Sequence, residues 1–253
     1  MTRLAVTGAT GAMGREVRRS ATEREGVTPA LLVSQSGSID DVSTPVVHPD
    51  ELATGLETQN IDVLVDFTLP SGSVELVTTA ATVGVPAVVG TTGFDTTQRE
   101  RLESLAEDIP ILVAPNFSRG IQTLLAALDE TVGKLDGYDI ELTETHHNRK
   151  RDAPSGTANR LLETIEAHRP ETKRVFGRAG DSPRSRDEIG IHVRRAGNIT
   201  GEHEVIFAGF DEVVTLTHRA ESRAVFAVGA LDAAEWLSGQ SPGWYTFAEV
   251  VDT

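Results

Sequence analysis

Short apolar runs alternate with amphipathic stretches through the first half of the chain. The apolar run at 62–67 is continuous, which suits a strand buried on both faces of a sheet. Applied along this half, hydrophobic periodicity and turn residues predict strands at 4–7, 30–34, 62–67, 86–89 and 111–114, and helices at about 15–23, 70–83 and 96–107. The repeated strand–helix order predicts an α/β fold with a parallel sheet and right-handed crossovers.

The second half has a different pattern. It predicts helices at 118–132, 155–168 and 222–237, and strands at 138–145, 189–195, 203–207 and 212–218. Ser155 suits the N-cap of the second helix. The last three strands follow one another without a helix, which predicts an antiparallel or mixed sheet in a separate, smaller α+β unit. The loop 170–187 is a candidate mobile element, and a polar tail follows the last helix.

Composition narrows the class of protein. The 253 residues contain 39% hydrophobic and 24% charged residues, so we expect a packed core. There is no apolar run of membrane-spanning length, no signal-peptide pattern and no cysteine. These features predict a cytoplasmic protein without disulfides, thiol nucleophiles or cysteine-ligated metals.

The charge balance is strongly acidic. Lys and Arg number 23 against 38 Asp and Glu, a net charge of −15, which would repel nucleic acid and anionic membranes. Only three lysines occur, Lys134, Lys150 and Lys173. Few lysines and many carboxylates resemble proteins from a high-salt cytoplasm, where salt screens self-repulsion. An ordinary acidic enzyme remains the alternative.

A glycine-rich turn, Gly8 to Gly14, lies between the first predicted strand and helix. Glycines let the backbone approach a pyrophosphate, and the helix start supplies free N–H groups. The GxxGxxG spacing thus favours a nicotinamide dinucleotide, against a glycine turn without a ligand. After the second strand stand Ser34 and Gln35, with neither an acid nor a base. Both can donate to a 2′-phosphate, so we expect NADPH, with NADH also possible.

A second motif, residues 144–158, concentrates groups that can exchange protons. His146, His147 and Lys150 lie within five positions. Lysine is scarce in this chain, and unlike arginine it can readily give up a proton. Ser155, Gly156 and Thr157 open a predicted helix, whose unpaired N–H groups would bind a carboxylate with the Thr157 hydroxyl.

Two other interpretations of this motif are a metal site and a solvated basic loop. Adjacent histidines on a strand point to opposite faces, and no fixed set of carboxylates is evident. We therefore predict no metal. The solvated loop remains open for any single residue.

Two further segments follow predicted strands, at the sheet edge where ligands gather in such folds. The candidate cofactor-binding residues there are Gly90, Thr91 and Thr92, and Ala114, Pro115, Asn116 and Phe117. Either segment could instead serve only as a turn or a helix cap.

Together these segments resemble the 4-hydroxy-tetrahydrodipicolinate reductase (dihydrodipicolinate reductase) family, essentially from end to end. The matching segments are 65–68, 90–94, 116–118, 144–158, 195–203, 216–220 and 222–223. The stretch 144–158 is the most specific of them.

The resemblance implies a Rossmann-type, doubly wound dinucleotide-binding domain at 1–116 and 220–253. A substrate-binding and oligomerisation domain at 117–219 would join a homotetramer through its sheets. The implied reaction reduces a small cyclic dicarboxylate with NADPH or NADH, in lysine and diaminopimelate biosynthesis.

The resemblance also implies residue roles. His146 and Lys150 would be the catalytic proton donors, and His147, Ser155, Gly156 and Thr157 would bind substrate carboxylate. The implied cofactor-binding residues are Gly8, Ala9, Thr10, Gly11, Ala12, Met13, Gly90, Thr91, Thr92, Ala114, Pro115, Asn116 and Phe117. Ser34 and Gln35, which stand where the family can have an acid-containing pair, are added from their own chemistry. Two rivals remain: a sugar or amino-acid dehydrogenase, and a non-catalytic dinucleotide sensor.

Overall fold

The computed structural model describes residues 1–253 and divides the chain into two compact units. Unit 1 comprises residues 1–118 and 223–253, and unit 2 comprises residues 119–222. The sequence predicted breaks after residues 116 and 219; the structure has them after 118 and 222.

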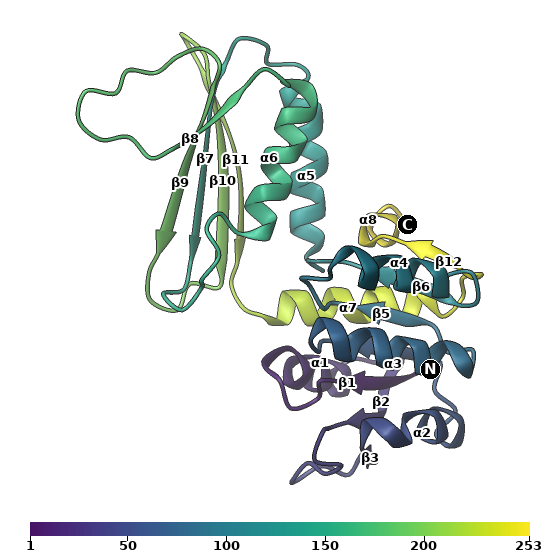
Figure 1. Ribbon diagram of the computed structural model, residues 1–253. Helices are drawn as coiled ribbons and strands as arrows, with labels where there is room; N and C mark the ends of the chain where they lie inside the picture. Colours follow the sequence, from purple (N-terminus) through teal and green to yellow (C-terminus); the bar gives the residue numbers. More distant parts are fainter. The chain divides into compact units, whose positions relative to one another are not determined.

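Unit 1 is built on a seven-stranded, fully parallel sheet (Figure 1). Its strands, in spatial order, are β12 (Gly243–Tyr245), β6 (Pro110–Val113), β5 (Ala87–Val89), β4 (Val63–Asp66), β1 (Thr2–Thr7), β2 (Val27–Val33) and β3 (Val46–Val47). Its helices are α1 (Ala12–Glu23), η1 (Pro49–Glu51, one 3-10 turn), α2 (Leu52–Thr58), α3 (Pro70–Thr82), α4 (Thr96–Leu105), α7 (Ala224–Leu237) and α8 (Phe247–Val251).

Both faces of this sheet are covered by helices, as the continuous apolar strands predicted. Strand β1 shows why: Leu4 and Val6 enter one core cluster and Ala5 enters the other, because alternate side chains of a strand point to opposite faces. Buried residues of α1, α7 and α8 complete the first cluster, and those of α2, α3 and α4 complete the second. The predicted doubly wound α/β fold is therefore confirmed.

Two parts of unit 1 differ from the sequence prediction. The stretch 46–58 holds β3, η1 and α2, none of which was predicted. The supposed polar tail holds β12 and α8, and Phe247 and Val250 of α8 are buried. Strands β3 and β12 are only two and three residues long, so pairing with β2 and β6, rather than their own pattern, defines them.

Unit 2 contains a five-stranded mixed sheet and two helices. In spatial order the strands are β11 (Val213–Ala220), β10 (Gly201–Ala208), β7 (Asp139–His146), β9 (Glu188–Arg195) and β8 (Lys173–Phe176), and the helices are α5 (Arg119–Val132) and α6 (Gly156–His168). β10 runs antiparallel to β7 and β11, whereas β9 runs parallel to β7 and β8. The prediction of a mixed sheet is confirmed.

Helices α5 and α6 cover one face of the unit 2 sheet (Figure 1). On β7, Ile140 and Leu142 point to this face and pack in the core with both helices. Glu144 and His146 continue the same two-residue alternation, so both lie on the helix-covered face at the strand's end. The apolar pattern of one strand thus places two titratable side chains inside the unit.

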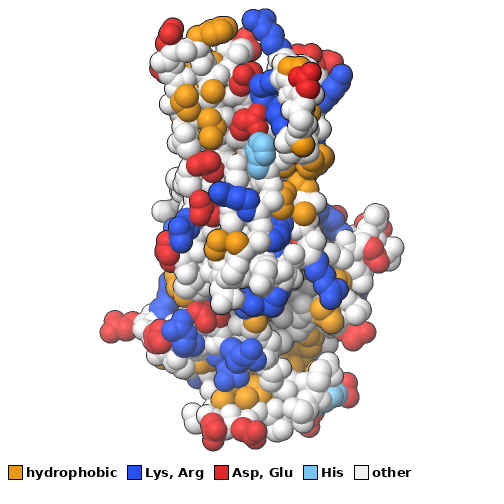
Figure 2. All heavy atoms as spheres, turned by 90° about the vertical axis from the view of Figure 1, so that its left-hand side faces the viewer, with side chains coloured by type: hydrophobic (Ala, Val, Ile, Leu, Met, Phe, Trp, Pro, Cys, Tyr) orange, Lys and Arg blue, Asp and Glu red, His pale blue; other side chains and the backbone are white.

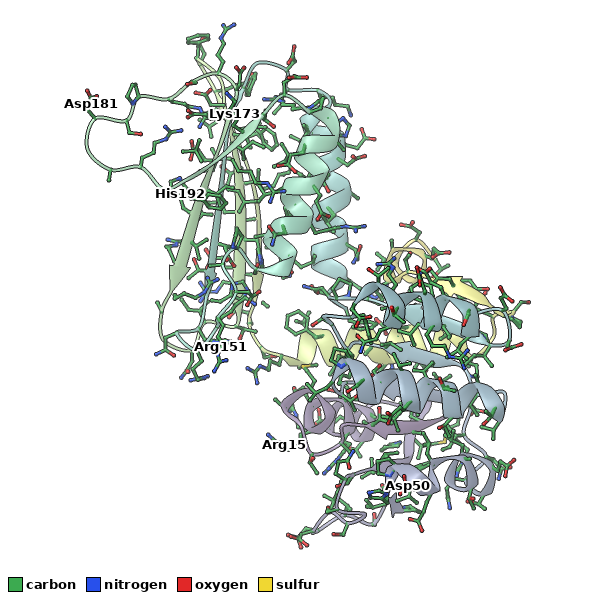
Figure 3. The ribbon with its side chains drawn as sticks, viewed as in Figure 1. Arg15, Asp50, Arg151, Lys173, Asp181 and His192 are labelled. Carbon is green, nitrogen blue, oxygen red and sulfur yellow. The ribbon has the colours of Figure 1, made fainter.

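The loop 170–187 contains strand β8, which the sequence did not predict. Beyond β8 the chain extends away from the sheet at Asp181 (Figure 3). Arg184 returns it to β7, with its Nε 2.9 Å from Asp139 and its guanidinium bonded to Glu141. The segment expected to be a mobile element is therefore anchored near its end.

The surface carries the charge that the composition predicted. On the face drawn in Figure 2, basic side chains lie among acidic ones, so the carboxylate excess forms no single patch there. None of the helices has the length and apolar character needed to span a bilayer.

Gly229 of α7 provides a test of the packing in unit 1. A Cβ there would lie 1.8 Å from the carbonyl oxygen of Phe117, whereas one at Gly72 of α3 would meet nothing within 4 Å. We expect Gly229→Ala to lower the free energy of unfolding by about 1–3 kcal/mol, since overpacking outweighs the gain in helix propensity. Gly72→Ala is the matched control and should be neutral or stabilising. Denaturant unfolding measures both, and equal effects would contradict this packing.

Candidate active site

The glycine-rich turn between β1 and α1 has a backbone shape that requires glycine. Gly8 has φ +64°, and a Cβ on it would lie 2.4 Å from the carbonyl oxygen of Phe67. The Gly11 N–H donates to the Gly8 carbonyl at 2.8 Å, which closes the turn. Helix α1 then begins at Ala12. Its N-cap is Gly11, which has no side chain to bond the first N–H groups of the helix.

This helix start leaves backbone donors available to an anion. The first N–H groups of a helix have no intrahelical partner, and their dipoles favour a phosphate. Thr10, Gly11 and Ala12 are exposed, whereas Ala9 is buried and Met13 packs against the core. Of the predicted residues here, Thr10 to Ala12 are therefore exposed at the helix start, and Ala9 and Met13 support the turn.

A buried carboxylate that the sequence did not single out joins the strand ends of unit 1. Asp66, at the end of β4, has no exposed surface. It accepts hydrogen bonds from the hydroxyls of Thr7 at 2.5 Å, Thr68 at 2.7 Å and Thr91 at 2.7 Å. Because Thr7 precedes the glycine turn and Thr91 follows β5, Asp66 fixes two predicted cofactor-binding loops against each other.

Three of the seven residues predicted after β5 and β6 line one hollow. A cavity of about 220 Å³ is lined in part by Thr91, Thr92, Pro115 and Trp244. Ala114 is buried beside them, and Asn116 caps the following turn by accepting from the Ser118 N–H at 2.8 Å.

Three of the predicted cofactor residues contribute backbone or internal contacts. Gly90 donates its N–H to the Asp66 carbonyl at 2.8 Å, and a Cβ there would collide with the Phe67 ring. The Phe117 ring packs edge-on against Phe67 and Phe247 in the core. Phe117 can therefore offer a ligand only its backbone. The Thr91 hydroxyl is already used by Asp66.

Ser34 and Gln35, the residues expected to decide between NADPH and NADH, directly follow β2. Ser34 is buried, with its hydroxyl 3.0 Å from that of Ser36, while Gln35 is exposed. No carboxylate occurs among these three residues. The end of β2 therefore presents hydroxyl and amide groups.

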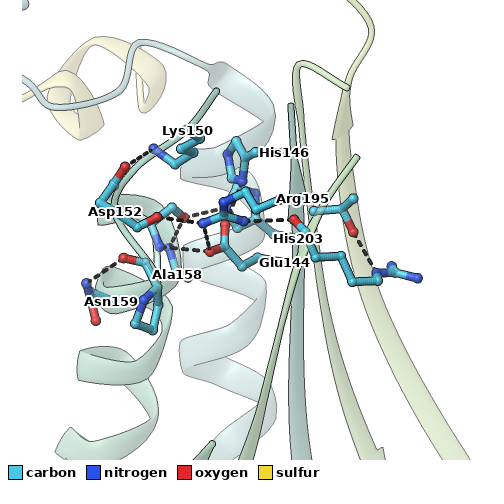
Figure 4. A network of polar contacts seen from close by, with 12 residues as sticks. Glu144, His146, Lys150, Asp152, Ala158, Asn159, Arg195 and His203 are labelled. Atoms are coloured by element: carbon cyan, nitrogen blue, oxygen red, sulfur yellow. Dashed lines mark hydrogen bonds and ion pairs between the residues drawn. The ribbon is translucent and has the colours of Figure 1, made fainter. Parts of the chain in front are cut away.

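In unit 2, the buried Glu144 side chain is the centre of a polar network (Figure 4). Its Oε2 lies 2.6 Å from Nδ1 of His146, two residues along β7. Its Oε1 accepts from the Arg195 guanidinium at 2.8 Å and from the Ser155 N–H at 3.0 Å. Arg195 also donates to the Asp152 carbonyl at 2.6 Å. One carboxylate therefore connects β7, β9 and the start of α6.

The network keeps Glu144 ionised. Burial by itself would raise the pKa of Glu144, but hydrogen bonds from His146, Arg195 and Ser155 outweigh burial and lower the pKa to about 2. The carboxylate is thus a permanent hydrogen-bond acceptor near neutral pH.

The predicted N-cap is confirmed, and a further histidine supports it. The Ser155 hydroxyl accepts from the Ala158 N–H at 3.1 Å and lies 3.1 Å from Nε2 of His203. The His203 ring meets that of His146 edge-on, with centroids 5.2 Å apart. Burial, and then the charge of His146, lower the pKa of His203 to about 3. His203 is therefore neutral and cannot serve as the acid.

The other predicted residues lie in the turn between His146 and α6. The Lys150 ammonium is 2.8 Å from the Asp152 carboxylate. Burial acts to raise the pKa of Asp152, but the hydrogen bond and charge of Lys150 lower it below its usual value. Gly156 is exposed and Thr157 is half-buried, both in the first turn of α6. His147 directly follows β7.

The metal interpretation gains one feature that the sequence did not show. Glu144, His146 and His203 offer ligand atoms within 4.8 Å of one another, in a buried position. However, Arg195 lies 2.8 Å from the same carboxylate, and its fixed positive charge opposes a cation. The charge of Arg195 therefore argues against a metal ion at this position.

Comparisons with known families cover both units. The model of the dihydrodipicolinate reductase N-terminus matches residues 2–117, and that of the C-terminus matches residues 120–251. The chain belongs to the dihydrodipicolinate reductase family. The second match covers unit 2, including the motif at 144–158 that a sugar or amino-acid dehydrogenase would not explain.

Relatives are similar over the whole chain. A 4-hydroxy-tetrahydrodipicolinate reductase of Haloarcula marismortui is 53% identical over 252 residues, covering 100% of both chains. One from Natronomonas pharaonis is 50% identical and covers 97% of this chain and 98% of its own. The solved dihydrodipicolinate reductase of Paenisporosarcina sp. TG-14, with dipicolinate bound, has TM-score 0.82 and 26% identity, and covers 97% of each chain.

From the sequence alone we assigned no role to Asp66, Glu144, Arg195 or His203. For Glu144, Arg195 and His203, the sequence and the strand pairing together contain a signal. Glu144 and His146 are two apart on a strand and so share a face. On β10, His203 lies opposite Glu144 of β7, and on β9, Arg195 lies opposite His146 of β7. Only the strand register, which the sequence did not provide, brings these side chains together.

His203 gives a test of the buried network. Because its pKa is lowered, the unfolded chain takes up a proton below about 6.5 that the folded chain does not. The free energy of unfolding should therefore fall with pH from about 6.5 towards 3, by up to about 1.4 kcal/mol per pH unit. His203→Gln should lose this component, whereas the control His168→Gln, at a histidine paired with Asp129, should retain it. Denaturant unfolding at several pH values measures it; equal slopes for wild type and His203→Gln would refute the assignment.

Proposed function

We propose that this chain reduces 4-hydroxy-tetrahydrodipicolinate to tetrahydrodipicolinate with a nicotinamide cofactor, in lysine and diaminopimelate biosynthesis. The supporting observation is the arrangement in unit 2 of a chain of this family. His146 is held by a buried carboxylate that also bonds the N-terminus of α6, so a proton donor and an anion-binding helix end share one anchor. A dinucleotide sensor would have no use for this arrangement.

Unit 1 is the proposed dinucleotide-binding unit. The backbone donors of Thr10 to Ala12 would meet the pyrophosphate, supported by Gly8, Ala9 and Met13. Thr92 and Pro115, with the backbone of Gly90, Thr91, Ala114, Asn116 and Phe117, would bind the nicotinamide end. The bound nicotinamide supplies the hydride.

Unit 2 is the proposed substrate-binding unit. The solved relative is described with dipicolinate, a planar dicarboxylate. In this chain, Gly156 and Thr157 in the first turn of α6 would bind a substrate carboxylate, with Ser155 holding the helix start in place. His147 and Lys150 supply donors that offset the second carboxylate. Such local positive groups are needed because the net charge of −15 opposes the entry of an anion.

Two groups would handle protons. Reduction of a conjugated, nitrogen-containing ring leaves negative charge that must be protonated, so a proton donor must lie beside the ring. We assign this role to His146. Lys150, which is paired with Asp152, is the second donor.

The cofactor preference rests on the end of β2. Without a carboxylate at Ser34 or Gln35, nothing there repels a 2′-phosphate, and the exposed Gln35 amide can donate to it, whereas the buried Ser34 hydroxyl is bonded to Ser36. NADPH is the favoured cofactor, and NADH is also used.

Two wider properties belong to the same proposal. The acidic, lysine-poor composition and the relatives from Haloarcula and Natronomonas support activity in concentrated salt. A homotetramer would form through the face of the unit 2 sheet that α5 and α6 leave uncovered. Alternate side chains of β11 are exposed, including Val213.

The catalytic assignment predicts a loss of activity when His146 or Lys150 is replaced, but not when a histidine or lysine elsewhere in unit 2 is replaced. We expect His146→Ala and Lys150→Ala to lower kcat by about 10²–10⁴-fold, the usual contribution of a general acid, without weakening cofactor binding. The control His192→Ala removes a histidine paired with Glu141, and Lys134→Ala removes a lysine paired with Glu130. Both controls should remain active. The assay follows nicotinamide oxidation in concentrated potassium chloride, with substrate made in situ from pyruvate and aspartate semialdehyde. Tight cofactor binding without substrate-dependent turnover at any salt concentration would contradict the function.

The cofactor preference can be tested with one isosteric change. Gln35→Glu places a carboxylate at the exposed end of β2. It should raise KM for NADPH at least about tenfold by charge repulsion with the 2′-phosphate, and leave KM for NADH nearly unchanged. NADH, which lacks that phosphate, is the internal control. Equal changes for both cofactors would show that Gln35 does not meet this group.

A further inference from the structure

We infer that Glu144 is a positioning residue that fixes the tautomer and orientation of His146, so that Nε2 carries the proton given to the substrate. The inference rests on the proposed function of His146. It adds a role for a side chain that would not itself contact substrate or cofactor.

The geometry at the imidazole shows how Glu144 would act. Nδ1 of His146 lies 2.6 Å from Glu144 Oε2, a close ion-pair contact, although the ring N–H does not point directly at this oxygen. An ionised carboxylate can only accept, and two facing lone pairs at this distance would repel each other, so the contact favours the tautomer with the hydrogen on Nδ1. The neutral ring then has a free lone pair at Nε2, and the protonated ring has its transferable proton there.

The opposite edge of the ring is left open by a glycine. A Cβ on Gly201, the first residue of β10, would lie 3.0 Å from Nε2 of His146, closer than ordinary contact. Any side chain at this position would crowd Nε2. The ring is therefore anchored through Nδ1 and unobstructed by position 201 at Nε2.

Glu144 keeps its negative charge because its other oxygen is fully used. Arg195 and the Ser155 N–H both donate to Oε1, at 2.8 and 3.0 Å. These bonds, with that to His146, keep the pKa of Glu144 near 2 despite burial, so the carboxylate does not take the proton from His146. The other titratable groups around the ring cannot replace it. His203 is neutral, and Lys150 is a donor.

The same carboxylate fixes the distance between the acid and the anion site. Glu144 bonds Ser155, the N-cap of α6, and Arg195 reaches from Glu144 to the Asp152 carbonyl. The turn that carries Lys150 is thus tied to the strand that carries His146. A shift of Glu144 would move the proton donor relative to the helix end, which would reduce the rate more than the affinity.

Glu144→Gln tests this role with almost no change in size. An amide presents one oxygen, already required by Arg195 and Ser155, and therefore turns an NH₂ group towards Nδ1. The ring must then invert its tautomer or rotate. Glu141→Gln is the matched control, because Glu141 lies on the same strand and also contacts one histidine and one arginine, His192 and Arg184.

The experiment combines kinetics with nitrogen-15 spectra of the imidazoles, with the His146 signals assigned from a His146→Gln sample. We expect the Nδ1–H form of neutral His146 in the wild type, and loss of that form in Glu144→Gln only. In Glu144→Gln, kcat should fall by about 10²–10⁴-fold with KM for the cofactor unchanged, as expected for a general acid in the wrong tautomer.

Three results would overturn the inference: an Nε2–H tautomer in the wild type, an unchanged tautomer and kcat in Glu144→Gln, or an equal loss of kcat in Glu141→Gln. If Glu144→Gln fails to fold, the wild-type spectrum alone decides. The spectrum does not depend on turnover, so an inactive wild type would refute the proposed function while the role of Glu144 is still measured.

Discussion

A carboxylate buried away from water is stable only when hydrogen bonds and opposite charges compensate it, and this requirement organises the candidate active site. Glu144 has no exposed surface, and its partners come from β7, from β9 and from the residue that caps α6. Removing any partner would leave charge without compensation. The structure therefore holds His146, Arg195 and Ser155 together as one unit, whichever of them meets the substrate.

Unit 1 also contains a buried carboxylate with compensating partners, but none of these partners is a cation. Asp66 is equally buried, and three threonine hydroxyls surround it. These threonines belong to the segments that carry the glycine turn and the residues after β4 and β5. Each unit thus places one buried carboxylate where loops leave the strand ends, so the sheet helps to fix the loops.

The sequence predicted the parts that depend on local pattern. Continuous apolar runs identified the parallel strands of unit 1, and the serine before a glycine and a threonine identified the N-cap of α6. Strands β3 and β12 were missed because pairing with β2 and β6 defines such short segments. Glu144 was part of a recognised motif, yet its role was invisible. It depends on register with β9 and β10, which places Arg195 and His203 beside it. The three-threonine cluster around Asp66 was missed for the same reason.

The central claim is that the start of α6 and the side chain of His146 form the dicarboxylate site. Titration of the wild-type chain with dipicolinate, followed by backbone amide and imidazole spectra, tests it most directly. We predict that the largest shifts occur at Gly156, Thr157 and His146, with those at the control histidine His192 unchanged. Dipicolinate binding that shifts none of these three residues would contradict the account.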